Sequence, residues 1–69
     1  MNINDAKTLG QIIRNRRKNQ GFTQQDVADF TGMSTSFISD VENGKPTCEI
    51  NKCIKLANVL GLDINIVER

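Results

Sequence analysis

Apolar residues recur at helical spacing in four separate stretches of the chain. This pattern predicts helices over residues 5–19, 24–31, 35–43 and 48–60. The inward-facing positions would be Leu9, Ile12 and Ile13 in the first helix, Val27 and Ala28 in the second, Phe37, Ile38 and Val41 in the third, and Ile50, Cys53, Ile54, Ala57 and Leu60 in the fourth. The sequence therefore predicts an all-α domain of four helices, and 69 residues are enough for one domain, residues 1–69.

Polar residues and glycines mark where these helices begin and end. The predicted N-caps are Asn4 or Asp5, Thr23, Ser34 and Thr47, in chain order. A glycine follows each helix, at Gly21, Gly32, Gly44 and Gly61. Since glycine readily takes the left-handed backbone that closes a helix, these positions favour short connections.

The connection between the second and third helices is especially short. It consists of Gly32-Met33-Ser34, and Ala28 is small enough for the two helices to cross closely. Ile38 and Val41 are placed to wedge the third helix against the second. These are the steric requirements of a helix-turn-helix, predicted over residues 24–43.

The last eight residues follow a different pattern, in which apolar and polar residues alternate. Leu62, Ile64 and Ile66 alternate with Asp63 and Asn65, which predicts a β-strand over residues 62–68. A single strand cannot satisfy its own backbone groups, and no second strand pattern exists in the chain. We expect the strand to pair with the same strand of another copy about a two-fold axis. The alternative is a frayed or helical tail.

Charge is divided unevenly along the chain although the net charge is only +1. Residues 1–25 hold five Lys or Arg and one Asp, whereas residues 26–69 hold four Lys or Arg and seven Asp or Glu. The basic run at residues 14–18 is either part of a positive binding face or a solvated helix face. The chain has no His, Trp or Tyr. This excludes a Ser-His-Asp triad and His-ligated zinc, and we expect no enzymatic activity.

The two cysteines, Cys48 and Cys53, fall in the fourth predicted helix. A five-residue separation in a helix corresponds to about 7.5 Å of axial rise, which is too far for an undistorted disulfide. The spacing does not match a metal site either. We therefore expect reduced thiols, no metal and no cofactor, in a cytoplasmic chain with no signal peptide and no membrane-spanning segment.

Several short segments together carry a family resemblance. They are Ile13-Arg14, Arg17, Gly21-Phe22-Thr23-Gln24, Val27-Ala28, Gly32-Met33-Ser34, Ile38-Ser39 and Val41-Glu42-Asn43-Gly44-Lys45-Pro46. With them, residues 9–61 resemble the helix-turn-helix domain of the phage repressor and Cro superfamily, also called the XRE family. Residues 37–47, followed by a short terminal strand instead of a fifth helix, are most similar to HipB-type antitoxin regulators.

This resemblance implies a lambda-repressor-like fold and assigns roles to particular residues. Facing the bases of the major groove would be Thr35, Ser36, Ser39 and Asp40. Contacting phosphates would be Gln24, Asn43, Lys45 and Arg14. The resemblance further implies an internal ion pair between Arg17 and Glu42, which would fix the third helix to the first. The dimer contacts would come from Leu62, Ile64 and Ile66 of the strand.

The chemistry of the predicted base-facing residues limits what they can read. None is Arg, Asn or Gln, so we expect more reliance on phosphates, water and DNA shape than on bidentate base contacts. Asp40 is either an acceptor for a cytosine amino group or a solvated acid that repels phosphate. Phe30 is either a dimer or partner contact or the edge of the core, and Arg16 is expected to face solvent.

The resulting functional hypothesis is a homodimeric transcriptional repressor that binds a palindromic operator in double-stranded DNA. The resemblance to HipB-type regulators implies an autoregulating antitoxin that also binds a HipA-type kinase toxin. One alternative is a stand-alone regulator of a phage or mobile element. The other is a protein-interaction module that has lost DNA binding, which the near-neutral charge and the weak base-reading face would suit.

Overall fold

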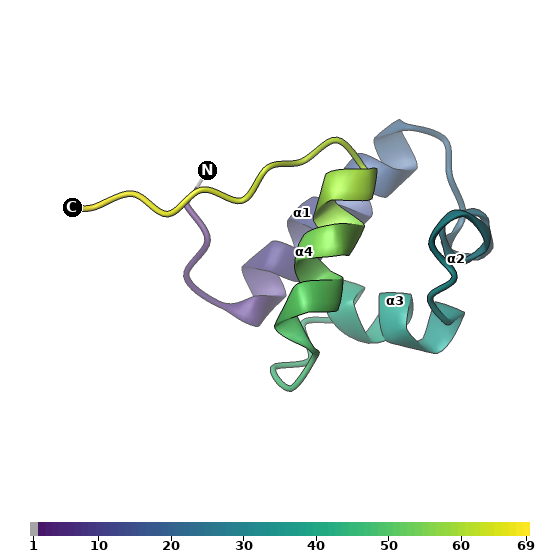
Figure 1. Ribbon diagram of the computed structural model, residues 1–69, viewed down its shortest axis with the longest axis horizontal. Coiled ribbons are helices and arrows are strands. Elements are labelled where there is room, and N and C mark those ends of the chain that lie inside the picture. Colours follow the sequence, from purple (N-terminus) through teal and green to yellow (C-terminus); the bar gives the residue numbers. More distant parts are fainter. Residues whose placement is uncertain (1) are drawn as a thin grey trace.

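The computed structural model describes residues 2–69 and contains four helices in that range (Figure 1). Helix α1 spans Ala6–Asn19, α2 spans Gln24–Thr31, α3 spans Thr35–Glu42 and α4 spans Ile50–Val59. The four predicted helices are confirmed, and the bounds of the first three agree with the prediction to within one residue. Within residues 2–69 the chain forms no strand.

Side-chain caps explain where the first three helices begin. Asp5 accepts a hydrogen bond from the Thr8 N–H at 2.7 Å, and Ser34 accepts one from the Phe37 N–H at 3.0 Å. At the start of α2, Thr23 and Asp26 form a reciprocal capping box. Each bond satisfies a backbone N–H that the helix itself leaves without a partner.

The start of α4 differs from the prediction. Thr47 is not its cap, because residues 46–48 form a turn and bend and the helix begins at Ile50. The N-cap is Glu49, which makes no side-chain capping hydrogen bond. Cys48 therefore lies outside the helix that contains Cys53, and the expectation that both cysteines share one helix is wrong.

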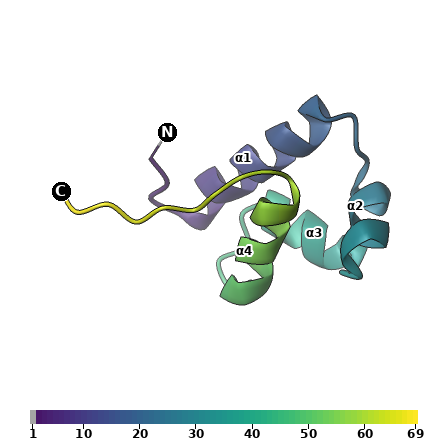
Figure 2. The same cartoon turned by 45° about the horizontal axis from the view of Figure 1, so that its top comes forward.

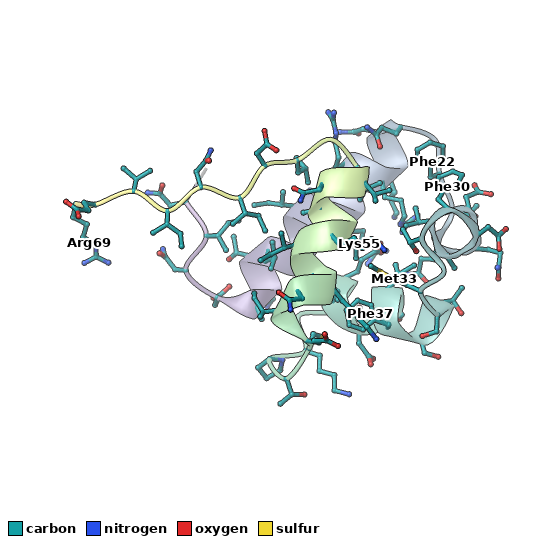
Figure 3. The ribbon with its side chains drawn as sticks, in the orientation of Figure 1. Phe22, Phe30, Met33, Phe37, Lys55 and Arg69 are labelled. Carbon is teal, nitrogen blue, oxygen red and sulfur yellow. The ribbon has the colours of Figure 1, made fainter. Side chains whose placement is uncertain are left out.

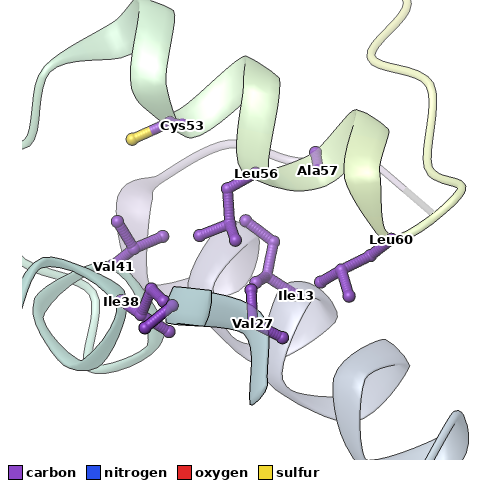
Figure 4. Close-up of a cluster of buried hydrophobic side chains, with 9 residues drawn as sticks. Ile13, Val27, Ile38, Val41, Cys53, Leu56, Ala57 and Leu60 are labelled. Carbon is purple, nitrogen blue, oxygen red and sulfur yellow. The ribbon is translucent and has the colours of Figure 1, made fainter. Parts of the chain in front are cut away.

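The core joins all four helices. Its fully buried side chains are Ile13, Val27, Ile38, Leu56 and Leu60, with Ala28, Val41, Cys53 and Ala57 around them (Figure 4). Two residues expected in this core are exposed, since Ile50 is 64% and Ile54 is 36% accessible. The buried stripe of α4 instead runs through Cys53, Leu56, Ala57 and Leu60. Ile50 and Ile54 therefore lie outside the buried stripe of α4. Leu56 belongs to this stripe, although it is not among the residues predicted to face inward.

Helix α1 crosses α3 at a position without a side chain. A Cβ added at the buried Gly10 would lie 2.2 Å from the Val41 carbonyl oxygen and 2.9 Å from that of Glu42. Both distances are far below normal van der Waals contact. The close approach of α1 to the end of α3 therefore requires glycine at this position.

The C-terminal segment begins against the helices, since Leu62 packs on the core and Ile64 lines a pocket with Leu9 and Ile12 of α1, and it becomes fully exposed only further along. After the Leu62 N–H donates to the Ala57 carbonyl at 2.9 Å, the chain runs away from the helices on the side of the N-terminus (Figures 1 and 2). Ile66 is 99% exposed and Val67 is 82% exposed. The predicted strand at residues 62–68 thus has no pairing partner among residues 2–69. Its pairing with a second copy stays a prediction.

Candidate nucleic-acid interface

The α2–α3 connection has the geometry of a sharp helical corner. Gly32 ends α2 in the left-handed conformation, with φ +74°, and its N–H donates to the Ala28 carbonyl at 2.9 Å. Only Met33 separates this glycine from Ser34, the N-cap of α3. The chain therefore turns sharply within three residues, and α3 lies at the border of the molecule (Figure 1).

Helix α3 has one buried face and one polar face. Ile38, Val41 and Glu42 are each no more than 5% exposed. Ser36 and Asp40, which are four residues apart, lie on the opposite side of the helix by its periodicity, and Ser39 lies on the flank between the two faces. Ser36 is exposed, whereas Thr35, Ser39 and Asp40 are half-buried. The predicted base-facing residues thus gather on α3, with Ser36 and Asp40 furthest from the core.

The residues predicted to contact bases and those predicted to contact phosphates lie against one another at the end of α3. The Lys45 Nζ is 3.5 Å from the Asp40 Oδ2, and both side chains are about half exposed. The Asn43 Nδ2 donates to the Ser39 Oγ at 3.3 Å. In this arrangement Lys45 compensates the charge of Asp40, so the end of α3 presents little net charge to solvent.

A bidentate ion pair fixes α3 to α1. The Arg17 Nε and Nη2 donate to the Glu42 Oε2 and Oε1 at 2.7 and 2.9 Å, and the two side chains are only 9% and 2% exposed. Arg17 also donates from Nη1 to the Phe22 carbonyl at 2.8 Å. The structure thus contains the ion pair expected from the resemblance, and it holds the loop before α2 as well.

The same network sets the protonation of Glu42. Burial by itself would raise the pKa of this carboxyl, but hydrogen bonds from Arg17 and Gln24 outweigh it and hold the pKa below its ordinary value. In return, the hydrogen bond to Glu42 raises the pKa of Arg17. Both groups are therefore charged near neutral pH, and each is the partner that permits the other to be buried.

Gln24 occupies a different position from the one expected of a free phosphate ligand. Its Nε2 donates to the Glu42 Oε1 at 3.1 Å, so its side-chain amide belongs to the ion-pair network. Its backbone N–H lies in the first turn of α2, where helices leave N–H groups without an internal partner. That group, rather than the whole side chain, remains available for an anion.

The two other arginines of α1 that were singled out have different environments. Arg14 is exposed and therefore accessible to a phosphate. Arg16 is exposed, as expected, and it also donates from Nε to the Leu60 carbonyl at 2.8 Å, beside a second donation from Gln20 at 3.0 Å. These bonds cap the end of α4. Sequence reasoning missed this role because the two partners are 44 residues apart.

Phe30 takes the core-edge role, one of the two that the sequence left open, and its dimer or partner contact stays a prediction. Its ring packs edge-on against Phe22, with centroids 4.9 Å apart and an interplanar angle of 79° (Figure 3). It nevertheless stays 57% exposed. Phe30 therefore supports the core edge and leaves aromatic surface at the outside of α2.

Among residues 2–69, no group of three or more potential metal-ligating side chains comes together. In the same range, no helix is both long enough and apolar enough to cross a bilayer.

Comparisons with known proteins support a common architecture. Residues 13–67 match a family model described as helix-turn-helix. The chain is 37% identical over 65 residues to the uncharacterized HTH-type transcriptional regulator y4mF of Sinorhizobium fredii, covering 94% of this chain and 86% of that one. It is 33% identical over 64 residues to the ImmF control region 10 kDa protein of Bacillus phage phi105, covering 93% and 71% of the two chains.

Solved structures of HipB complexes have the same fold. A HipB–O4 20mer complex superimposes with a TM-score of 0.89 at 22% identity, covering 99% of this chain and 96% of that chain. An O2 20mer complex of a serine-to-alanine variant of HipB gives the same TM-score and identity.

Proposed function

The chain belongs to the helix-turn-helix family whose model it matches over residues 13–67, and from this premise we propose that it is a non-catalytic transcriptional repressor that binds double-stranded DNA through α3. The observation that carries the proposal is the construction of α3. Its inner face is anchored by Ile38, Val41 and the buried Arg17–Glu42 pair, and its outer face presents short polar side chains. A rigid helix with a polar outer face is what insertion into a major groove requires.

The residues on the outer face of α3 determine which contacts this helix would make with base edges. Ser36 and Ser39 carry hydroxyls that donate to or accept from any base edge, and Asp40 accepts from a cytosine amino group. Asp40 is held by Lys45 at 3.5 Å, and this exposed pair is weak enough to open. When Lys45 moves to a phosphate, Asp40 becomes free to face a base. Much of the affinity would then come from phosphates contacted by Lys45, Arg14 and the start of α2.

We further propose that the protein acts as a homodimer on a palindromic operator. Leu62, Ile64 and Ile66 would form an antiparallel strand pair with the tail of a second copy. The support is the alternating sequence pattern together with the extended, exposed tail. The two α3 helices would then enter major grooves about 34–36 Å apart, which is one turn of DNA.

Within this role we favour an autoregulating antitoxin that also restrains a HipA-type kinase. The similarity to HipB over nearly the whole chain motivates this assignment, although at 22% identity it establishes the fold alone. A stand-alone phage regulator is the second candidate, which the relative from phage phi105 favours. Purification of the chain with the product of its neighbouring gene separates the two, because only the antitoxin would carry a kinase with it.

DNA binding is tested with a duplex taken from the region upstream of the gene. In fluorescence anisotropy, Lys45→Glu should weaken binding and reduce the slope of log affinity against log salt by about one. Lys55→Glu is the matched control, because it makes the same charge change at an exposed lysine of α4 that is not a predicted DNA contact. Equal affinity for the operator and for a scrambled duplex, with no salt dependence, would contradict the proposal.

A further inference from the structure

The segment between α3 and α4 brings the two cysteines to the same place. Cys48 lies in the bend that ends this loop, two residues before α4, and Cys53 lies in the first turn of α4. The separation calculated for a continuous helix therefore does not apply to them. Both are free thiols.

The two sulfur atoms share one apolar environment. Both cysteines line a pocket of about 290 Å³ between the N-terminal segment, α1 and the start of α4. Cys53 is 4% exposed and belongs to the core (Figure 4). Cys48 is half-buried and packs against that core. Burial raises the pKa of the Cys53 thiol, and the adjacent Cys48 thiol raises it further. Both thiols therefore lie at one pocket beside the core, and Cys48 is the accessible member.

We propose that Cys48 and Cys53 form an oxidation site at which hydrogen peroxide converts the two thiols into one intramolecular disulfide. The accessible thiol reacts first and the buried thiol resolves the product. Neither cysteine is a predicted DNA contact, and disulfide formation can be measured without DNA, so its test is separate from the test of the proposed function.

The reaction proceeds in two balanced steps. The Cys48 sulfur attacks one peroxide oxygen, so that an S–O bond forms, the O–O bond breaks and water leaves, which oxidises Cys48 to a sulfenic acid. The Cys53 sulfur then attacks the Cys48 sulfur. The S–S bond forms, the S–O bond breaks, and the hydroxyl leaves as a second water with the Cys53 proton. Two thiols and one peroxide give one disulfide and two waters.

The cross-link would connect the α3–α4 loop to α4. This loop begins at Asn43 and carries Lys45, and no side-chain hydrogen bond caps the helix that follows it. A disulfide between Cys48 and Cys53 would hold the start of α4 covalently to the loop that precedes it. It would also restrict the loop that follows α3.

The test uses the full reduced chain with equimolar hydrogen peroxide and no DNA. We expect a monomer that is lighter by two hydrogen atoms in intact mass spectrometry and that returns to the starting mass with a reductant. Trypsin cleaves after Lys52, between the two cysteines, so in the oxidised protein the peptide that starts at Cys53 should stay linked to the preceding one. In the reduced protein the same two peptides should separate.

Single variants distinguish this pair from general thiol oxidation. Cys48→Ser, which changes the half-buried residue and leaves the core intact, should prevent both the mass change and any oxidation of the buried Cys53. Cys53→Ala should leave a Cys48 sulfenic acid that dimedone traps. The proposal is overturned if the wild-type chain remains fully reduced, gains oxygen atoms without a disulfide, or forms only disulfides between chains.

Discussion

The four helices and the C-terminal tail of this protein obey different rules. In the helices every buried side-chain nitrogen and oxygen among residues 2–69 has a partner, and five large side chains are fully buried. The tail exposes Ile66 almost completely and has no ladder of backbone hydrogen bonds. A helix satisfies its backbone within itself, whereas a strand needs a neighbour. One chain therefore suffices to build the helices, while the tail needs a second molecule to become regular.

The largest loss of stability in the helices is expected when one partner of the buried Arg17–Glu42 ion pair is removed. Arg17→Met leaves Glu42 charged and buried, so the free energy of unfolding should fall by about 3–5 kcal/mol. Chemical denaturation followed by circular dichroism measures this loss. Lys52→Met is the control, because it breaks the exposed Lys52–Glu49 pair, at 3.7 Å, and should cost less than about 1 kcal/mol. Similar losses for both variants would show that the Arg17–Glu42 pair is not effectively buried.

A smaller loss is expected where α1 crosses α3. In Gly10→Ala the added methyl group meets the Val41 carbonyl oxygen, and the helices must separate, at a cost of about 1–3 kcal/mol. Gln11→Ala, at the exposed neighbouring position of the same helix, should change the stability by no more than about 0.5 kcal/mol. Thermal unfolding of both variants gives the comparison. If Gly10→Ala were as stable as the wild type, the close crossing would be incorrect.

The helices also show which features the sequence alone predicts and which it does not. Helix positions follow from local periodicity and caps, so α1, α2 and α3 were predicted almost to the residue. The importance of Gly10 depends on how α1 and α3 cross, which no local pattern encodes. Leu56, by contrast, fits the i, i+3, i+4, i+7 spacing of Cys53, Leu56, Ala57 and Leu60, so the periodicity alone contained that signal. In the candidate interface, periodicity places Ser36 and Asp40 on the outer face of α3. The Lys45–Asp40 contact and the commitment of Gln24 to Glu42 depend on where the chain leaves α3 and enters α2.

Acid should weaken the helices through the same ion pair. The pKa of Glu42 is lowered on folding from an ordinary value of 4.5. The pair's stabilisation is therefore complete above pH 4.5 and is lost as the pH falls through the lower folded-state value. Melting temperatures measured between neutral and acidic pH should decline below this point. Glu42→Gln should reduce the decline without abolishing it, because the pKa of Asp5, lowered chiefly by hydrogen bonding from the Thr8 backbone, also contributes. An unchanged decline would contradict the assignment to Glu42.

A substitution in the tail, unlike one in the helices, should have almost no effect on the free energy of unfolding of a single chain. Ile66→Asp changes a side chain that is 99% exposed, so at low protein concentration the free energy of unfolding should shift by no more than about 0.5 kcal/mol. At high concentration the same change should abolish dimers in sedimentation equilibrium. Ile66 would lie on the apolar face that Leu62, Ile64 and Ile66 form along the paired strands, and the substitution places a charge there.

Val67→Asp is the matched control for this last experiment, because alternation along a strand places Val67 on the other face and it is 82% exposed. It should leave the dimer largely intact. The pairing also predicts that the melting temperature of the wild type rises with concentration, since association stabilises only the folded chain. A wild-type protein that stays monomeric at every concentration would show that the tail's alternation does not encode a dimer. In that case the tail would be a solvated end of the chain and would have no part in assembly.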